Sequence, residues 1–445
     1  MTVPVVRVAA RPLSPALRPG DILLADALHR PSGTQHTRAY GLLAGALRAR
    51  GRTVVTGPAA VAGARAPEGR EPALVELLPG QELPHPDAPA AVLCVIQDPA
   101  DPAGADEARA AADRVLADWK RARGDRRIRL AAPRSFCAGV ERAVDIVDRA
   151  LDQYGAPVYV RKQIVHNRHV VDRLAARGAV FVDELDEVPE HELVVFSAHG
   201  VAPAVRDAAA DRGLRVIDAT CPLVTKVHAE ARRFASQGKT VVLIGHAGHE
   251  EVEGTMGEAP DRTVLVQTPE EAAALEVPDP GSVSYLMQTT LAMSEASAVA
   301  EALADRFPAI AAPQSDDICY ASTNRQNAVE EIAGEVDLLL VVGSANSSNS
   351  VRLTELAERM GTTGHLVDDV SHVELGWLHG GVRRIGLTAG ASAPDELVQE
   401  IIANLAALGA IEVTEHPVAT ENITFQLPKV LRRGRSDMET TVDRH

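Results

Sequence analysis

Short apolar runs alternate with longer amphipathic stretches from Ile128 to near residue 415. The runs are rich in Val, Ile and Leu, and amphipathic stretches of helical length follow them. Unbroken apolar strands followed by helices are typical of parallel sheets that are covered on both faces. The pattern predicts strands at 128–132, 157–160, 193–197, 216–219, 240–245, 282–287, 336–343 and 384–388.

The first 127 residues differ from the rest, because they are rich in Ala, Pro, Arg and Gly. Their pattern predicts strands at 52–56 and 91–96 and helices at 36–50 and 105–123. We interpret residues 1–127 as a small α/β extension and the basic stretch 120–127 as its linker to the rest of the chain. At the other end, 423–427 is predicted as a β segment inside a C-terminal tail, 416–445.

Composition and charge exclude some classes of protein. The 445 residues carry a formal charge of −16, and only 3% are aromatic, which argues against a general nucleic-acid-binding protein. The net charge is +3 over residues 1–127 and −19 over 128–445, which we interpret as a solvated acidic surface. We find no secretory signal pattern and no apolar run of about 18 residues, so we expect no membrane span.

The four cysteines are far apart, which does not resemble a disulfide framework and indicates a reducing, cytoplasmic setting. Cys137, Cys221 and Cys319 each come close to the point where a helix is expected to begin. A helix N-terminus presents unpaired amides and a positive dipole end, so we expect the pKa of these thiols to be lowered. Cys94 lies inside an apolar run and is expected in a core.

These three cysteines are candidate metal ligands. They are 84 and 98 residues apart, each interval about the size of one small α/β layer, so we expect three similar units that each donate one cysteine. Three thiolates bind zinc together with a histidine, or an iron–sulfur cluster in which one iron lacks a protein ligand. Compact zinc modules bring paired C-x-x-C ligands, which this sequence lacks. Three unrelated buried cysteines are the third interpretation.

Polar residues follow other predicted strands or precede other predicted helices. Ligands of parallel α/β sheets bind beyond the carboxyl ends of strands, where helix N-termini attract phosphate. The candidates for donating hydrogen bonds to a phosphate are His166, His199, His249, Ser347, Ser348, Asn349 and Ser392. Glu251, among histidines and glycines, is a candidate proton donor, and Thr289 a candidate relay. Taken singly, such residues are more often solvated loop histidines, helix caps or first-turn glutamates.

A series of motifs occurs in one order along the chain. They are 136–140 (FCAGV), 164–168 (IVHNR), 196–201 (FSAHGV), 218–228 (DATCPLVTKVH), 244–249 (IGHAGH), 252–257 (VEGTMG), 288–290 (QTT), 317–319 (DIC), 323–326 (TNRQ), 346–350 (NSSNS) and 388–394 (TAGASAP). With them, residues 128–430 closely resemble the 4-hydroxy-3-methylbut-2-enyl diphosphate reductase family. One departure is Ser135, where that family usually has glycine, and we expect the small serine to be tolerated.

The resemblance implies a fold and a set of ligands. The fold would be three small parallel-sheet α/β units in a trefoil around a central 4Fe–4S cluster, bound by Cys137, Cys221 and Cys319 with one open iron. We place these units at 128–220, 221–316 and 317–415. The diphosphate would bind the three histidines, Ser347, Ser348, Asn349 and Ser392.

The resemblance also implies an activity. The substrate's hydroxyl oxygen would bind the open iron, and Glu251 with Thr289 would supply protons. Two electrons from ferredoxin or flavodoxin would release water and give isopentenyl and dimethylallyl diphosphates, the last step of the methylerythritol phosphate route to isoprenoids. The resemblance does not cover residues 1–127, whose role stays open between docking, dimerisation, regulation and no catalytic part.

Two alternatives remain. Quinolinate synthase also places three single cysteines from three α/β units around an open-iron cluster, so fold-level reasoning does not exclude it. The serine–asparagine cluster at 347–349 and Glu251 favour the diphosphate reductase. A non-enzymatic redox or iron sensor descended from the reductase predicts loss of the acid, yet Glu251 is present.

Overall fold

The computed structural model describes residues 6–12, 20–30, 33–36, 40–61, 73–77, 92–95 and 102–431. The chain forms two compact units. Unit 1 comprises Met1–Arg127, Asp369–Arg383 and Gln399–Glu412, and unit 2 comprises Ile128–Asp368, Arg384–Val398 and Val413–His445. Two segments from the C-terminal third of the sequence therefore complete the N-terminal unit. None of the helices among the described residues is both long and apolar enough to cross a membrane.

Unit 1 contains a mostly antiparallel sheet. Its strands are β1 (Val6–Pro12), β2 (Ile22–Arg30), β3 (Gly33–His36), β4 (Val54–Val61), β5 (Ala73–Leu77) and β6 (Val92–Val95). The order is β3-β2-β4-β1-β5-β6, and β2 also pairs with β6. Within the described residues the pairings therefore close a ring, which leaves β3 outside it. A closed ring satisfies backbone groups that an open sheet edge would leave unpaired.

Helices α1 (Gly41–Arg48) and α2 (Pro102–Ala122) belong to this unit, together with the short helices η2 (Val370–His372) and η3 (Leu375–Leu378) and residues 399–405 of α12 (Asp395–Leu405). Leu42, Leu43 and Leu47 of α1 are fully buried. The backbone N–H of Leu42 donates to Asn404 Oδ1 at 3.4 Å. The extension is thus packed against segments of the chain that follow residue 368, and it does not make up the whole of its unit.

Gly45 shows how closely α1 packs in unit 1. An added Cβ would lie 1.8 Å from the backbone oxygen of Ser371. Gly→Ala in an open helix normally stabilises by about 1 kcal/mol. Here we expect Gly45→Ala to lower the free energy of unfolding by roughly 1–3 kcal/mol, as overpacking does.

Chemical denaturation followed by circular dichroism measures this effect. Gly376→Ala is the matched control, because an added Cβ there meets nothing within 4 Å. If Gly45→Ala matches the stability of Gly376→Ala, the close approach of α1 to Ser371 is wrong.

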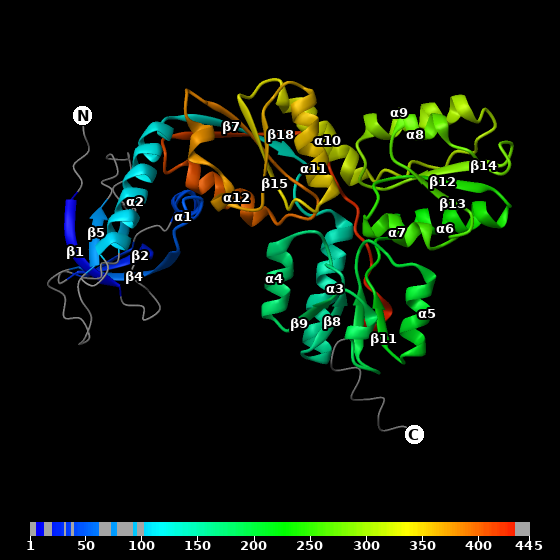
Figure 1. The fold of residues 1–445 in the computed structure, drawn as a ribbon, viewed down its shortest axis with the longest axis horizontal. Coiled ribbons are helices and arrows are strands. Elements are labelled where there is room, and N and C mark those ends of the chain that lie inside the picture. Colours follow the sequence, from blue (N-terminus) through cyan, green and yellow to red (C-terminus); the bar gives the residue numbers. More distant parts are fainter. Residues whose placement is uncertain are drawn as a thin grey trace. The chain divides into compact units, whose positions relative to one another are not determined.

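Unit 2 is built on three small sheets in the part of the chain that the structure describes (Figure 1). The first has the order β11-β10-β8-β9, the second β13-β12-β14 and the third β16-β15-β17-β7-β18. The strands are β7 (Arg126–Ala132), β8 (Val158–Arg161), β9 (Ala179–Val182), β10 (Leu193–Phe196), β11 (Arg215–Asp218), β12 (Thr240–Ile244), β13 (Thr263–Val266), β14 (Val283–Met287), β15 (Leu338–Val342), β16 (Gly364–Val367), β17 (Arg384–Ala389) and β18 (Ile411–Pro417). Neighbours in the first two sheets run parallel, as do β16, β15 and β17.

Helices follow most of these strands. They are α3 (Ala138–Tyr154), α4 (Arg168–Ala176), α5 (Pro203–Asp211), α6 (Pro222–Ser236), α7 (Glu250–Met256), α8 (Pro269–Ala274), α9 (Met293–Arg306), α10 (Tyr320–Ala333), α11 (Ser348–Arg359) and α12 (Asp395–Leu405), with short 3₁₀ turns η1 (Leu185–Glu187) and η4 (Lys429–Leu431). Pro222 and Pro203 occupy the first position of their helices, where the missing N–H costs no hydrogen bond.

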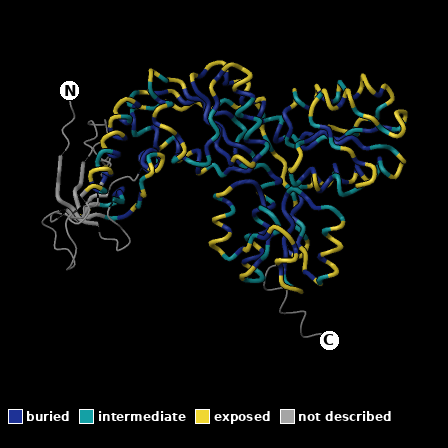
Figure 2. Tube along the Cα trace, viewed as in Figure 1, coloured by how far each residue is buried: buried dark blue, intermediate teal, exposed yellow. Residues whose placement is uncertain are grey.

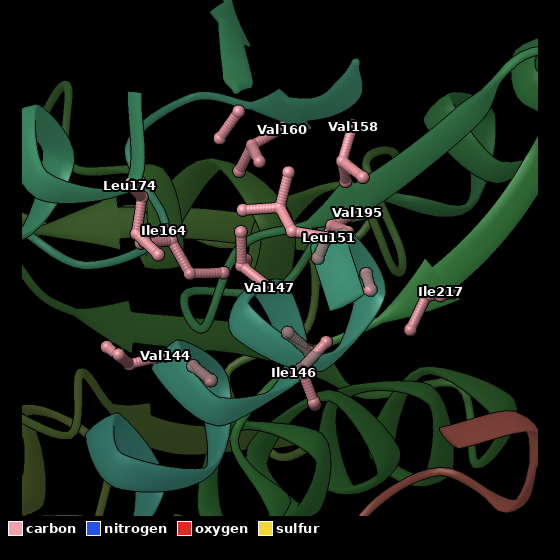
Figure 3. Close-up of a cluster of buried hydrophobic side chains, with 14 of the residues drawn as sticks. Val144, Ile146, Val147, Leu151, Val158, Val160, Ile164, Leu174, Val195 and Ile217 are labelled. Carbon is pink, nitrogen blue, oxygen red and sulfur yellow. The ribbon is translucent and has the colours of Figure 1, made fainter. Parts of the chain in front are cut away.

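Both faces of the first sheet are buried. Val195 packs with Val147 and Leu151 of α3, whereas Val194 and its neighbours pack on the opposite face near α5. Figure 3 shows the cluster on the α3 side, and Figure 2 shows buried strands with exposed outer helix faces. This double burial explains why the strands read as unbroken apolar runs.

The fold class predicted from the sequence, α/β with small parallel sheets, is confirmed. Each of the eight strands predicted after residue 127 overlaps an observed strand. The edge strands β9, β13 and β16, each of four residues, were not predicted.

Two predictions at the ends of this region are wrong. The stretch 120–127 is not a linker, since α2 continues to Ala122 and β7 begins at Arg126. Residues 423–427 are not a strand, and the chain pairs earlier, through β18. In both places hydrogen bonds to distant segments decide the structure. The backbone of Cys94 belongs to β6, while its side chain lies outside the described residues.

Candidate functional site

Cys137, Cys221 and Cys319 line one cavity of unit 2. Each lies where the chain passes from one sheet to a helix that covers the next. Cys137 separates β7 of the third sheet from α3, which packs on the first sheet, and Cys221 separates β11 from α6, which packs on the second. Cys319 directly precedes α10, which packs on the third sheet. The three sheets therefore share one site, and the unit limits drawn from the sequence stay a prediction.

The backbone holds the three cysteines in equivalent positions. The backbone N–H of each cysteine donates to a carbonyl in a loop that directly follows a strand. The bonds are Cys137 to Ala391 at 3.2 Å, Cys221 to Ala198 at 3.0 Å and Cys319 to Thr289 at 3.0 Å. The loops after β17, β10 and β14 thus position the thiols, and the same loops carry Ser392, His199 and Thr289 into the cavity.

Gly139 leaves room between two of the sulfurs. An added Cβ at this position would lie 2.7 Å from the Sγ of Cys221 and 3.8 Å from the Sγ of Cys137. Any larger residue would therefore fill the space that these thiols share. Cys319 Sγ lies 3.3 Å from the N–H of Ser322, which points toward it from the first turn of α10. Three soft donors around a small-residue opening suit a metal centre.

The expectation of lowered thiol pKa values is wrong for the protein without a metal. Burial raises the pKa of Cys137, that of Cys221 to about 12 and that of Cys319 to about 11. Backbone N–H groups of the following helices oppose this shift at Cys221, but burial outweighs them. A bound cation reverses this balance, because coordination deprotonates a thiol.

Three of the residues that line the cavity are histidines whose rings contact one another. The rings of His166 and His199 stack with centroids 4.0 Å apart, and His249 meets them edge-on at 5.3 and 5.7 Å. Burial, together with His199 and His166, lowers the pKa of His249 to about 3, and burial also lowers the pKa of His166. The imidazoles of His166 and His249 are therefore neutral near pH 7 and offer N–H donors rather than full charges.

Hydroxyl and amide groups lie beside the histidines. Ser347 Oγ is 3.3 Å from Ser392 Oγ, and Ser392 donates to the backbone oxygen of His166 at 2.9 Å. Asn349 Oδ1 accepts from the N–H of Ala391 at 2.9 Å, while its buried Nδ2 has no hydrogen-bond partner. A buried donor without a partner is costly, so Asn349 Nδ2 marks a place for a ligand acceptor.

Glu251 is a buried carboxyl group on the cavity wall. It is 2% exposed, and its two oxygens accept from Thr289, from the N–H at 2.6 Å and from Oγ1 at 2.8 Å. Burial raises the pKa of Glu251 even though both bonds favour the carboxylate. A raised pKa suits a group that must carry a proton near neutral pH.

All of the site residues predicted from the sequence line this one cavity. They are Cys137, His166, His199, Cys221, His249, Glu251, Thr289, Cys319, Ser347, Ser348, Asn349 and Ser392. Sequence reasoning did not single out Thr290, Ser322 or Glu250. Thr290 and Ser322 line the same cavity, and Glu250 bonds two of the predicted histidines. For Thr290 and Glu250 the available signal was a polar residue adjacent to a predicted one, and Ser322 follows Cys319 by three residues, which is one helical turn.

Ser135 adopts an unusual backbone conformation. Its φ of 60° lies in the left-handed region that favours glycine. Its hydroxyl donates to Asp395 at 3.1 Å, and its carbonyl accepts from the fully buried guanidinium of Arg325 at 2.6 Å. These bonds stabilise the turn before Cys137, and Ser135 does not line the cavity. The tolerance of serine at this position stays a prediction.

Comparisons with known proteins agree with the motifs. The family model described as LytB protein matches residues 128–406. The 4-hydroxy-3-methylbut-2-enyl diphosphate reductase of Leifsonia xyli is 58% identical over 312 residues, which cover 70% of this chain and 92% of that protein. The protein of the same name from Aeromonas salmonicida is 56% identical over 308 residues, covering 68% of this chain and 99% of the relative.

A solved structure supports the same comparison. The E-1-hydroxy-2-methyl-but-2-enyl-4-diphosphate reductase from Plasmodium falciparum superposes with a TM-score of 0.67 at 34% sequence identity. It covers 71% of this chain and 99% of its own. The family match begins at residue 128, so most of unit 1 lies before it.

Proposed function

Because the chain belongs to the LytB protein family, we propose that it reduces 4-hydroxy-3-methylbut-2-enyl diphosphate to isopentenyl and dimethylallyl diphosphates. It is an oxidoreductase of the isoprenoid pathway. One observation carries the proposal. Three thiols, a buried carboxyl group and a set of N–H and O–H groups that can donate hydrogen bonds to a phosphate line a single cavity. Each of these groups has a separate task in a reductive removal of a hydroxyl group.

The residues fit the iron–sulfur cluster that this family requires. Cys137, Cys221 and Cys319 supply thiolate ligands, and the missing side chain of Gly139 leaves room beside two of the sulfurs. Three protein ligands suit a 4Fe–4S cluster with one iron open to substrate. When bound, the cluster supplies the electrons of the reaction.

The three histidines and the neighbouring hydroxyl and amide groups bind the diphosphate in our proposal. His166, His199 and His249 offer N–H donors, and the hydroxyls of Ser347, Ser348 and Ser392 add further donors. Asn349 Nδ2, which lacks a partner, is the donor with most to gain from an anion. Many short neutral donors bind a polyanion without the bulk of arginine. The diphosphate then fixes how far the allylic end reaches toward the thiols.

Glu251 and Thr289 handle protons in our proposal. The reaction consumes two electrons and two protons, breaks the allylic C–O bond and releases water. The hydroxyl oxygen takes one proton, and the allyl carbon skeleton takes the second. Glu251, whose pKa is raised by burial, is the proton donor. Thr289 Oγ1, 2.8 Å from the carboxyl group of Glu251, relays this proton or orients the substrate's hydroxyl group.

The electrons must come from another protein. A ferredoxin or a flavodoxin, both one-electron carriers, is the donor that we propose, and a reducing cytoplasm is the compartment that keeps the thiols available for the cluster.

An anaerobic assay tests the proposal. Purified, iron-loaded protein with dithionite and a mediator should convert the allylic diphosphate into the two C5 diphosphates, measured by mass spectrometry. Protein that contains iron and sulfide but gives neither product would contradict the function. Conversion of quinolinate precursors instead would favour the quinolinate-synthase alternative.

A further inference from the structure

Glu250 is a charged residue that contacts two of the predicted phosphate-binding histidines and that sequence reasoning left out. It is the first residue of α7, next to Glu251. Its Oε2 accepts from His199 Nδ1 at 3.0 Å and from Ser197 Oγ at 3.4 Å, and its Oε1 lies 3.5 Å from His166 Nε2. The carboxylate therefore lies among groups that otherwise offer N–H donors to a phosphate.

Glu250 is ionised in this setting. Burial opposes its charge, yet hydrogen bonds from His166 and His199 hold the pKa of Glu250 well below its usual range. The side chain of Glu250 is only 20% exposed, and the side chains of His166 and His199 are 10% and 15% exposed. A full negative charge is thus held in a poorly hydrated position beside the site for an anion.

The bonds to Glu250 and the bonds to a phosphate need the same hydrogens. A neutral imidazole has a single N–H group. When a neutral His199 ring donates through Nδ1 to Glu250, its Nε2 is an acceptor and cannot donate to phosphate oxygen. In that form, diphosphate binding through His199 requires that Glu250 gives up this bond or that the ring gains a proton.

We propose that Glu250 is an internal anion that competes with the substrate's diphosphate for His166 and His199, and so sets how strongly the pocket binds anions. It is a positioning residue, because it acts through the two histidines. An anion remains bound only if further contacts, such as those to Ser347, Ser392 and Asn349, outweigh the lost carboxylate bonds. This inference rests on the proposed function, in which these histidines bind the diphosphate.

Glu250→Gln separates charge from shape. The amide keeps a hydrogen-bonding group at nearly the same volume but removes the charge beside the pocket. We expect inorganic pyrophosphate to bind the variant roughly tenfold more tightly, the scale of one charge at short range in a partly buried site. The KM for the allylic diphosphate should fall in the same direction.

Isothermal titration of inorganic pyrophosphate into anaerobic, iron-loaded protein measures the affinity without turnover. Glu253→Gln is the matched control, since Glu253 lies on the same helix but is exposed, and its affinity should stay within twofold of the unmodified protein. Glu250→Asp, which restores the charge, should return the affinity toward that of the unmodified protein. Tighter binding distinguishes competition from damage, because a misfolded pocket binds more weakly.

Two outcomes would overturn the inference. Weaker pyrophosphate binding by Glu250→Gln would mean that the carboxylate supports the histidines as phosphate donors, and an unchanged affinity would mean that it does not compete. Failure of the proposed function is a different result: the unmodified protein would bind pyrophosphate, and Glu250→Gln would bind it more tightly, while no C5 product formed in the assay.

Discussion

Glu251→Gln should reduce turnover by about 100-fold or more while the protein keeps its iron and its affinity for pyrophosphate. Glutamine has nearly the same volume and still accepts from Thr289, but its amide cannot deliver a proton to a departing hydroxyl. General acid catalysis contributes roughly 10²–10⁴ to rate. Because Glu251 is 2% exposed and bonded on both oxygens, water has little access to replace it.

Single-turnover kinetics on iron-loaded, pre-reduced protein is the measurement, since it isolates chemistry from electron delivery. Glu253→Gln on the same helix should turn over like the unmodified protein. A Glu251→Gln variant that turns over within a few-fold of the unmodified protein would remove Glu251 from the proton pathway. Loss of iron in this variant would show instead that the carboxyl group supports the metal centre.

Cys221→Ala should abolish both cluster binding and activity. Two remaining thiols cannot hold a cluster that needs three, and the small side chain leaves a gap beside Gly139. The same result is expected for Cys137→Ala and Cys319→Ala, because all three thiols line one cavity. Iron and sulfide analysis of anaerobically purified protein, with its visible absorption spectrum, gives the readout.

Cys94→Ala is the matched control, because Cys94 is the fourth cysteine of the chain. Cys94 belongs to β6 in unit 1, so its loss should leave iron content and activity intact. If Cys221→Ala retained a full complement of iron, the ligand set would be wrong. If Cys94→Ala lost iron together with the other variants, the loss would reflect general instability of the chain rather than missing ligands.

The N-terminal extension folds together with later segments of the chain in unit 1. Its residues share a unit with 369–383 and 399–412, and Gly45 and Leu42 contact Ser371 and Asn404. Removing residues 1–127 would expose apolar side chains such as Val370 and Leu375, which are buried in the intact chain. The extension is therefore part of the folded structure, whatever further role it has.

The sequence by itself determined most of the helices and strands of unit 2 and the residues that line the cavity. Runs such as Leu338–Val342 are apolar at every position because both faces of the strand are buried, and that pattern is local. Cys137, Cys221 and Cys319 were recognisable because each directly precedes a helix, and the motifs around them are local strings as well.

Only the tertiary structure decided which segments meet. β7 joins the third sheet although it precedes the first in sequence, and β2 closes a ring with β6. Burial, and not helix position, decides the thiol pKa values. Glu250 reads as a first-turn glutamate until folding brings His166 and His199 within reach of its carboxylate. These features depend on contacts between residues far apart in the chain, and no local pattern encodes such contacts.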